Sequence, residues 1–78
     1  MTTAPQTPLA RTALTLLNAK GNVTVDAGLP IPDLLILAEA AGKMGATMTL
    51  RRASVRPAVE LEKIARAGRG RVSFELAG

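Results

Sequence analysis

The chain has no cysteine, histidine, tyrosine or tryptophan, and Phe74 is its only aromatic residue. Without cysteine there are no disulfides and there is no thiolate chemistry. Without histidine and cysteine, the usual nucleophilic sites and the usual structural zinc sites are excluded. General acid–base chemistry would depend on aspartate, glutamate and lysine alone. We therefore expect no catalytic residues, no metal site, no cofactor, and a protein that is not an enzyme.

Long hydrophobic segments are also missing. No apolar run approaches the length of a membrane span. The N-terminal sequence MTTAPQTP lacks the basic and apolar regions of a signal peptide. We expect residues 1–7 to form a disordered leader and residues 8–78 to form one domain. The expected location is the cytoplasm, without membrane contact.

The chain is rich in aliphatic residues instead. Of its 78 residues, 47% are hydrophobic, which is too many for a disordered chain. With a single aromatic residue, the core must consist of leucine, isoleucine, valine, alanine and methionine, together with Phe74. A domain of this size buries only a modest share of its surface, so additional burial in a partner would stabilise it.

The hydrophobic pattern changes three times from the period of a helix to the alternation of a strand. In the central segment, Leu34, Leu37 and Ala41 lie on one helical face, and then Met48 and Leu50 alternate with threonines. The predicted elements are helix 8–19, strand 22–26, helix 32–43, strand 46–51, helix 57–67 and strand 71–76. Prolines open the helices at nearly equal spacings, at Pro8, Pro32 and Pro57. This regularity indicates three helix–strand repeats.

The order of these elements predicts an α/β fold with three parallel strands, because each link between strands contains a helix. The strands alternate between apolar and polar residues, whereas parallel strands covered on both faces are continuously apolar. We therefore expect one layer of helices on one face of the sheet and a polar face in water. This face would carry Thr24, Thr47, Thr49 and Ser73, opposite a buried face with Val25, Met48 and Phe74. Such a layout is typical of an α/β solenoid, whose strand face commonly binds partners.

The segment from Met48 to Val55, MTLRRASV, resembles leucine-rich repeats of the ribonuclease-inhibitor type. The segment from Ile36 to Ala41 is similar to the helical part of that repeat. The resemblance covers about residues 23–76 and implies a solenoid that binds proteins. Ala53 occupies the position of the family's asparagine, so the loops must form different hydrogen bonds. The order of strands and helices also resembles part of a STAS domain, although the segment before the central helix, 30–33, has no serine.

The net charge of +4 comes from one part of the chain. Residues 1–50 carry three basic and three acidic side chains, whereas residues 51–78 carry seven basic and three acidic ones. Such asymmetry can indicate nucleic acid or another anionic partner, which is the alternative function. The other interpretation is solubility, with some arginines favourably placed at a helix C-terminus. The candidate binding residues are Arg51, Arg52, Arg56, Arg69, Arg71, Thr47 and Thr49.

The first and last strands of such an array have open edges, and no capping unit covers the last one. We therefore expect a protein-interaction or self-assembly module, with a homo-oligomer as the simplest form. The favoured oligomer is a two-fold dimer that joins equivalent edges. Its candidate contact residues are Val72, Ser73, Phe74, Glu75 and Leu76. The substitution Ser73→Pro is expected to remove a ladder donor and break this dimer.

Overall fold

A computed structural model describes residues 7–76. The described chain contains three α-helices, three β-strands and one short 3₁₀ helix, η1. In chain order they are α1 Pro8–Asn18, β1 Val23–Asp26, α2 Ile31–Met44, β2 Met48–Arg51, η1 Ala53–Val55, α3 Ala58–Ala67 and β3 Val72–Phe74. The predicted elements are confirmed, and the strands are shorter at their ends than the sequence indicated.

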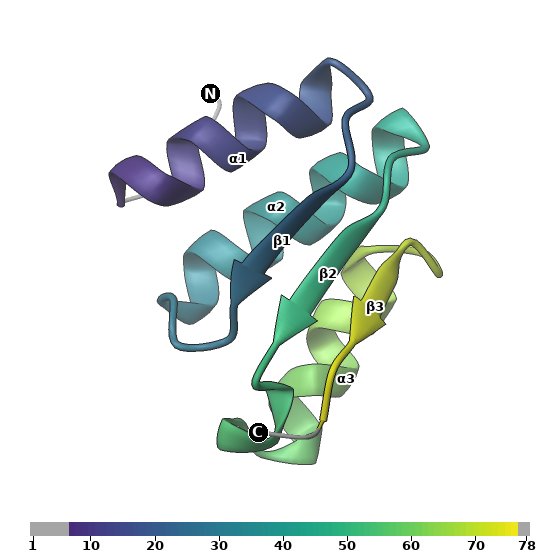
Figure 1. Ribbon diagram of the computed structural model, residues 1–78. Coiled ribbons are helices and arrows are strands. Elements are labelled where there is room, and N and C mark those ends of the chain that lie inside the picture. Colours follow the sequence, from purple (N-terminus) through teal and green to yellow (C-terminus); the bar gives the residue numbers. More distant parts are fainter. Residues whose placement is uncertain (1–6, 77–78) are drawn as a thin grey trace.

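The strands form one parallel sheet in the order β1-β2-β3. Val23 is aligned with Met48 across β1 and β2, and Met48 is aligned with Val72 across β2 and β3. Both outer strands have one unpaired edge within the described chain. The parallel α/β fold predicted from the sequence is therefore confirmed (Figure 1).

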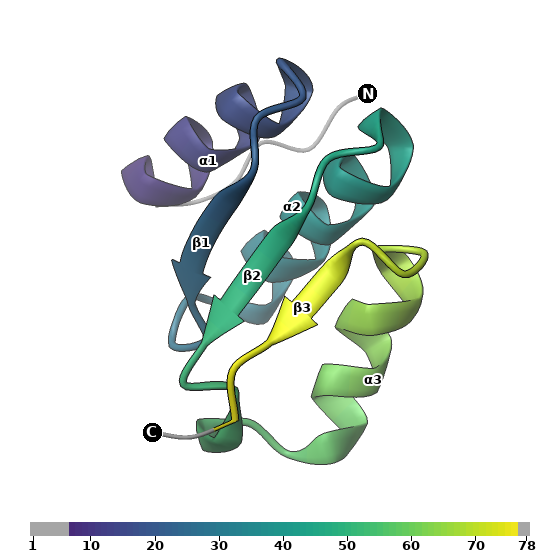
Figure 2. The same ribbon diagram turned by 45° about the vertical axis from the view of Figure 1, so that its right-hand side comes forward.

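All three helices lie on the same side of the sheet, as Figures 1 and 2 show from two directions. The helix-facing side chains of β2, Met48 and Leu50, are completely buried. On the other face, Thr24 and Ser73 are exposed, and Thr49 is half-buried between them. The alternation in the sequence thus corresponds to one covered face and one polar face, as predicted.

The core consists of aliphatic side chains and many alanines. Leu17, Leu34, Leu37 and Ile64 are fully buried beneath the sheet. Phe74, predicted to be a core residue, is only half-buried, because it lies on the outermost strand and packs against the margin of the core. The core therefore centres on α2 and β2, which are flanked by another element on each side.

The close approach of α2 and α3 depends on Gly42. Gly42 lies inside α2, and a Cβ atom there would be 2.8 Å from the carbonyl oxygen of Gly68. The helix ends at Gly45, whose φ of 72° is left-handed. Gly42 is therefore a packing residue and Gly45 a conformational one.

The start of α1 is attached to the start of α2 through a buried carboxylate. Asp33 is fully buried, and its Oδ2 accepts hydrogen bonds from the backbone N–H and the hydroxyl of Thr7, each at 3.1 Å. The Thr7 hydroxyl oxygen also accepts from the backbone N–H of Ala10 and so caps α1. Thr7, predicted to belong to the leader, is thus part of the fold. Residues 1–6 lie outside the described residues.

Candidate functional site

The polar face of the sheet carries a row of hydroxyl groups across the strands. Thr24 is aligned with Thr49, and Thr49 is aligned with Ser73. One residue before β2, Thr47 is half-buried, and its backbone N–H donates to the side-chain oxygen of Asn22 at 3.0 Å. The candidate residues Thr47 and Thr49 therefore lie on the uncovered face, as expected.

Two of the candidate arginines are engaged in structural contacts at the carboxyl end of the strands. Arg52 forms a bidentate pair with Asp26, with its Nε and one terminal nitrogen 2.8 and 2.9 Å from the carboxylate oxygens. The backbone N–H of Gly28 donates to the same carboxylate at 2.6 Å. This hydrogen bond, followed by the Arg52 guanidinium, lowers the pKa of Asp26 below its ordinary value. Arg52 and Asp26 thus join the end of β2 to the loop after β1.

Arg56 also binds the loop that follows β1. Its Nε donates to the carbonyl oxygen of Ala27 at 2.8 Å, and a terminal nitrogen donates to the carbonyl oxygen of Leu29. Its other terminal nitrogen lies 3.4 Å from a carboxylate oxygen of Glu60. Only 21% of the Arg56 side chain is exposed, so the guanidinium serves mainly as a donor to this loop.

The remaining candidate arginines do not form one patch. Arg51 ends β2, whereas Arg71 lies beside Thr47, where the strands begin, because the carbonyl oxygen of Arg71 accepts from the N–H of Met48. The length of β2 separates these positions by about 13 Å. Arg69 is in the turn before Arg71. The basic residues that are close in sequence are thus divided between two ends of the sheet.

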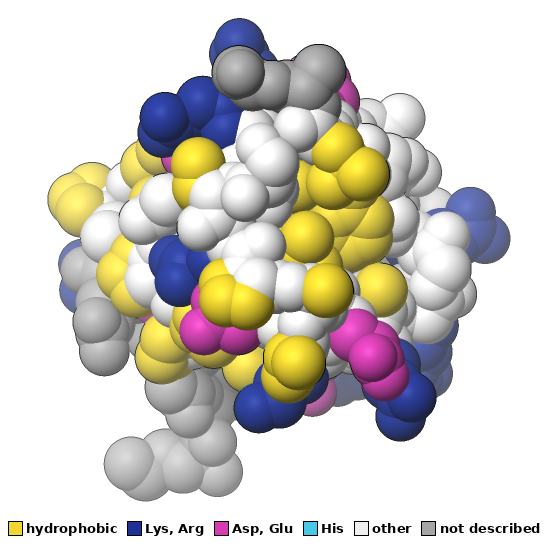
Figure 3. All heavy atoms as spheres, turned by 90° about the horizontal axis from the view of Figure 1, so that it is seen from below, with side chains coloured by type: hydrophobic (Ala, Val, Ile, Leu, Met, Phe, Trp, Pro, Cys, Tyr) yellow, Lys and Arg dark blue, Asp and Glu magenta, His cyan; other side chains and the backbone are white. Residues whose placement is uncertain are grey.

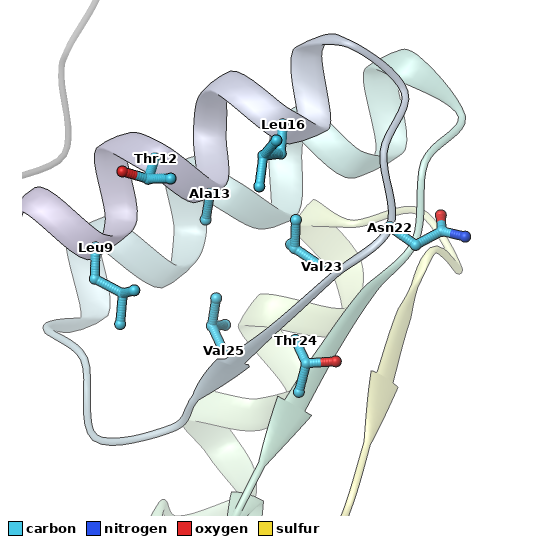
Figure 4. Close-up of a pocket in the computed structure, with 8 residues that line it drawn as sticks. All are labelled: Leu9, Thr12, Ala13, Leu16, Asn22, Val23, Thr24 and Val25. Carbon is cyan, nitrogen blue, oxygen red and sulfur yellow. The ribbon is translucent and has the colours of Figure 1, made fainter.

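A groove lies between α1 and the open edge of β1. It has a volume of about 220 Å³ and is lined by α1, β1 and the residue before β1. Figure 4 shows Leu9 and Leu16 pointing from α1 toward Val23 and Val25, while Thr24 points to the other face of the sheet. Both leucines are largely exposed, at 59% and 49%. The groove thus has an apolar floor and an unpaired strand along one side.

Each position in α1 corresponds to a position in α2 that lies a fixed number of residues later in the chain. This number, which we call the offset, is the separation between Val23 of β1 and Met48 of β2, which are aligned in the sheet. It also relates the helix ends: the N–H of Gly21 donates to the carbonyl of Leu16, and the N–H of Ala46 donates to that of Ala41. The left-handed residues near these two ends, Lys20 and Gly45, are separated by this offset as well.

At this offset, the exposed residues of α1 correspond to buried residues of α2. Leu9 corresponds to Leu34, and Leu16 corresponds to Ala41. Leu34 and Ala41 have no exposed surface. The reason is that α2 has α1 packed against one side and α3 against the other, whereas the described chain has no helix or strand beyond α1 and β1 (Figure 2).

The sequence analysis missed Leu9 and Leu16 as site residues. The helical spacing of α1 places Ala10, Ala13, Leu14 and Leu17 on one face; Leu14 is partly buried, and the other three are buried. Leu9 and Leu16 are two helical turns apart and lie on a second apolar face of the same helix. A helix that is apolar on two faces normally buries both of them. The second apolar face of α1 was therefore the signal in the sequence for a binding surface.

In β3, alternate residues direct their backbone N–H and C=O groups toward β2 and toward the open edge; we call this alternation the phase of the strand. The carbonyl of Arg71 and the N–H of Glu75 bond to β2, so the backbone groups of Ser73 also face β2. Those of Val72 and Phe74 face the open edge. The substitution Ser73→Pro would therefore break a hydrogen bond inside the protein. The prediction that it tests an interface is wrong, because the outward donors belong to Val72 and Phe74.

A second apolar area lies at the end of the molecule where the strands finish. Figure 3 views this end and shows hydrophobic side chains surrounded by basic and acidic ones. Val55 of η1, Val59 of α3 and Leu76, which follows β3, are each more than half exposed. Leu76 therefore extends the apolar character of the open β3 edge.

Within residues 7–76, no group of histidine, cysteine, aspartate and glutamate is arranged to hold a metal ion. In the same part of the chain, no helix has the length and apolar character needed to cross a bilayer. Comparison with known proteins found no matching family, curated protein or solved structure.

Proposed function

We propose that the protein is a non-enzymatic interaction module that binds an extended polypeptide segment at the open edge of β1. The observation that carries this proposal is the difference between α1 and α2. The same helical face is buried in α2, which has neighbouring elements on both sides, and is exposed in α1, which lies at the edge of the described fold. An added strand would cover Leu9 and Leu16 and would pair the unpaired backbone of β1.

Both components of strand addition are present at this site. The N–H of Val23 donates to β2, and that of Ala27 does the same just after β1, so the backbone groups of Thr24 face outward. These groups provide main-chain hydrogen bonds to a ligand. The apolar floor at Leu9 and Leu16 selects side chains on one face of the ligand strand. A suitable ligand therefore alternates between apolar and polar residues.

The proposal includes an architecture similar to leucine-rich repeats, because proteins built in this way commonly bind other proteins. In such arrays each unit buries its apolar face against its neighbours. The turn after β2 differs from the family as expected from Ala53. There, the N–H of Ala53 donates to the carbonyl oxygen of Glu75 at 2.9 Å. A backbone contact replaces the asparagine side chain of the family.

The test is a selection of extended peptides on the immobilised protein, with the variant Leu16→Lys used to remove other binders. Selected peptides are expected to alternate apolar and polar residues. In NMR spectra they should shift the Leu9 and Leu16 methyl signals and the Thr24 amide signal. Peptides that instead shift the Thr47 and Thr49 signals would place binding on the polar face. Failure to select any peptide that depends on Leu16 would contradict the proposal.

Binding of nucleic acid or another anionic partner stays a prediction, based on fewer residues than the sequence indicated. Arg52 and Arg56 are engaged by Asp26 and by loop carbonyls. The hypothesis therefore rests on Arg51, Arg69 and Arg71. If these residues contact phosphates, replacing them with glutamine should weaken binding, and log K should fall steeply with log salt. Absence of salt-dependent binding by the wild type at low ionic strength would end this alternative.

A further inference from the structure

We infer that the segment bound in the groove is β3 of a second copy of this chain, so that the protein assembles head to tail through a continued parallel sheet. This inference rests on the proposed function and names its partner. The two open edges of the sheet are different surfaces, and three of their properties are complementary: the phase of their backbone groups, their side chains and their helix cover.

The first property is the phase of the backbone groups. Between β2 and β3, the apolar residues Met48 and Leu50 direct their backbone groups toward the following strand. Their partners on β3, Arg71 and Glu75, are polar. Val72 and Phe74, the apolar residues of β3, continue this phase at the open edge.

On β1 the polar residues, not the apolar ones, direct their backbone groups toward the open edge. This is the arrangement needed for pairing with the open edge of β3. The outward backbone groups of β1 belong to polar positions, Thr24 and Asp26. If β3 of one copy precedes β1 of the next, Val72 aligns with Val23, and Phe74 aligns with Val25. This alignment repeats the existing registers, because Val23, Met48 and Val72 form one aligned row.

The second property is the match between side chains. On β3, Val72 and Phe74 are half-buried on the helix-facing side, and Leu76 continues this side beyond the strand. In the groove, Leu9 and Leu16 are the exposed residues below the open edge. A β3 strand placed there would cover both leucines with apolar side chains.

The third property is the helix cover. The β1 edge has the overhanging helix α1, whereas α3 precedes β3 and packs against α2. Figure 2 shows α1 and α3 on opposite sides of α2. Head-to-tail contact would place a strand beside α1 and would add a further helix, α1 of the next copy, beside β3. A two-fold dimer of β3 edges would leave the groove of each copy open.

A head-to-tail contact leaves one edge of each newly added copy free, so copies add to an open chain or until a ring closes. Each added copy offers a new β3 edge and a new α1 groove. The expected mass distribution is therefore a concentration-dependent series, in contrast to the single dimer expected from two-fold pairing.

Cysteine cross-linking tests this contact directly, since the natural chain has no cysteine. In the inferred assembly, Ser73 of one copy lies beside Thr24 of the next, at about the 4.8 Å separation of neighbouring strands, which a disulfide can bridge. Within one copy, Thr49 lies between these two residues. Their separation of about 10 Å therefore prevents an internal disulfide.

The experiment mixes the single variants Thr24→Cys and Ser73→Cys, which differ by an isotope label, under mild oxidation. We expect mixed disulfides between the two variants to exceed by about tenfold those of the control mixture of Thr49→Cys and Ser73→Cys, because Thr49 is on the central strand. Adding Leu16→Lys to Thr24→Cys should abolish the mixed product while circular dichroism stays unchanged. The double variant Thr24→Cys/Ser73→Cys should form a ladder of polymers.

Each other outcome overturns the inference in a recognisable way. A product dominated by Ser73→Cys homodimers would show the two-fold pairing of β3 edges. A strictly monomeric mass at high micromolar concentration, without mixed disulfides, would exclude self-pairing altogether. In that case, selected peptides that still bind at Leu9 and Leu16 would show that the groove accepts strands from a different protein. Loss of both results would contradict the proposed function as well.

Discussion

The helices α1 and α2 are built on the same plan, and their surroundings make them different. Both begin near proline, both are closely followed by a left-handed residue, and their positions correspond at one constant offset along the chain. Leu34 is buried because α2 is packed between α1 and α3, whereas Leu9 is exposed because α1 has a neighbouring helix on one side only within the described chain. The comparison shows how a helix at the edge of the fold exposes a residue whose counterpart in the central helix belongs to the core.

The largest expected effect is the loss of a core leucine at one of these two equivalent positions. Leu34→Ala should lower the free energy of unfolding by about 2–5 kcal/mol, since it leaves a cavity in the core. Leu9→Ala should change it by less than about 0.5 kcal/mol in dilute solution, because Leu9 is 59% exposed. Chemical denaturation of both variants measures the difference. Equal losses would mean that the groove is closed in the isolated protein.

A smaller effect is expected where α1 is attached to α2. Asp33→Ala removes the buried acceptor of the Thr7 N–H and hydroxyl and should cost about 2–3 kcal/mol. The control Thr7→Ser keeps both donors and should cost much less. Thermal denaturation measures both variants. A loss with Thr7→Ser as large as that with Asp33→Ala would show that packing of the threonine methyl group holds α1 in place.

The helix ends allow a comparison of the same backbone conformation with and without a side chain. Lys20 has a φ of 66°, and Gly45 has a φ of 72° at the equivalent position. Lys20→Gly should stabilise the protein by about 1 kcal/mol by relieving left-handed strain. Gly45→Ala should destabilise it by about 1 kcal/mol through the same left-handed strain, with no added clash with the rest of the protein, because a Cβ there meets no other atom within 4 Å. Denaturation curves in which both changes have the same sign would contradict this explanation.

The smallest expected effect concerns the loop after β1, which depends on a carboxylate, whereas the turn after β2 uses a backbone contact. The pKa of Asp26 is lowered in the folded state, first by the Gly28 N–H and then by Arg52. The ionised form therefore stabilises the fold above its ordinary pKa of 3.8, and this contribution is lost as the pH falls through the folded-state pKa. The stability difference between wild type and Asp26→Asn should be present at neutral pH and shrink in acid. A difference that is independent of pH would show that the charge plays no part.

Much of the fold could be predicted because it depends on local rules. The helical period around Leu34 and Leu37 specified a helix, and the alternation at Met48, Thr49 and Leu50 specified a half-covered strand. Glycine and proline marked the ends of the elements closely. The same alternation predicted a sheet with one polar face, which the exposed Thr24 and Ser73 confirm.

The candidate site could not be predicted in the same way, because charge and proximity in sequence do not reveal partners in space. Arg56 resembled its neighbour Arg51 in the sequence, yet it donates to the carbonyl oxygens of Ala27 and Leu29, which are remote along the chain. Phe74 appeared to be a core residue, and its place on the outermost strand leaves it half-buried.

By itself, the sequence determined the types of element, their order and the division of the sheet into an apolar and a polar face, since these follow from backbone preference and from the spacing of side chains along one segment. Only the tertiary structure decided which leucines are covered and which backbone groups face outward. Burial and strand pairing depend on what lies beside an element. Leu9 and Leu34 are thus distinguished by their neighbours, because within residues 7–76 α2 has a packed helix on both sides and α1 has one on one side only.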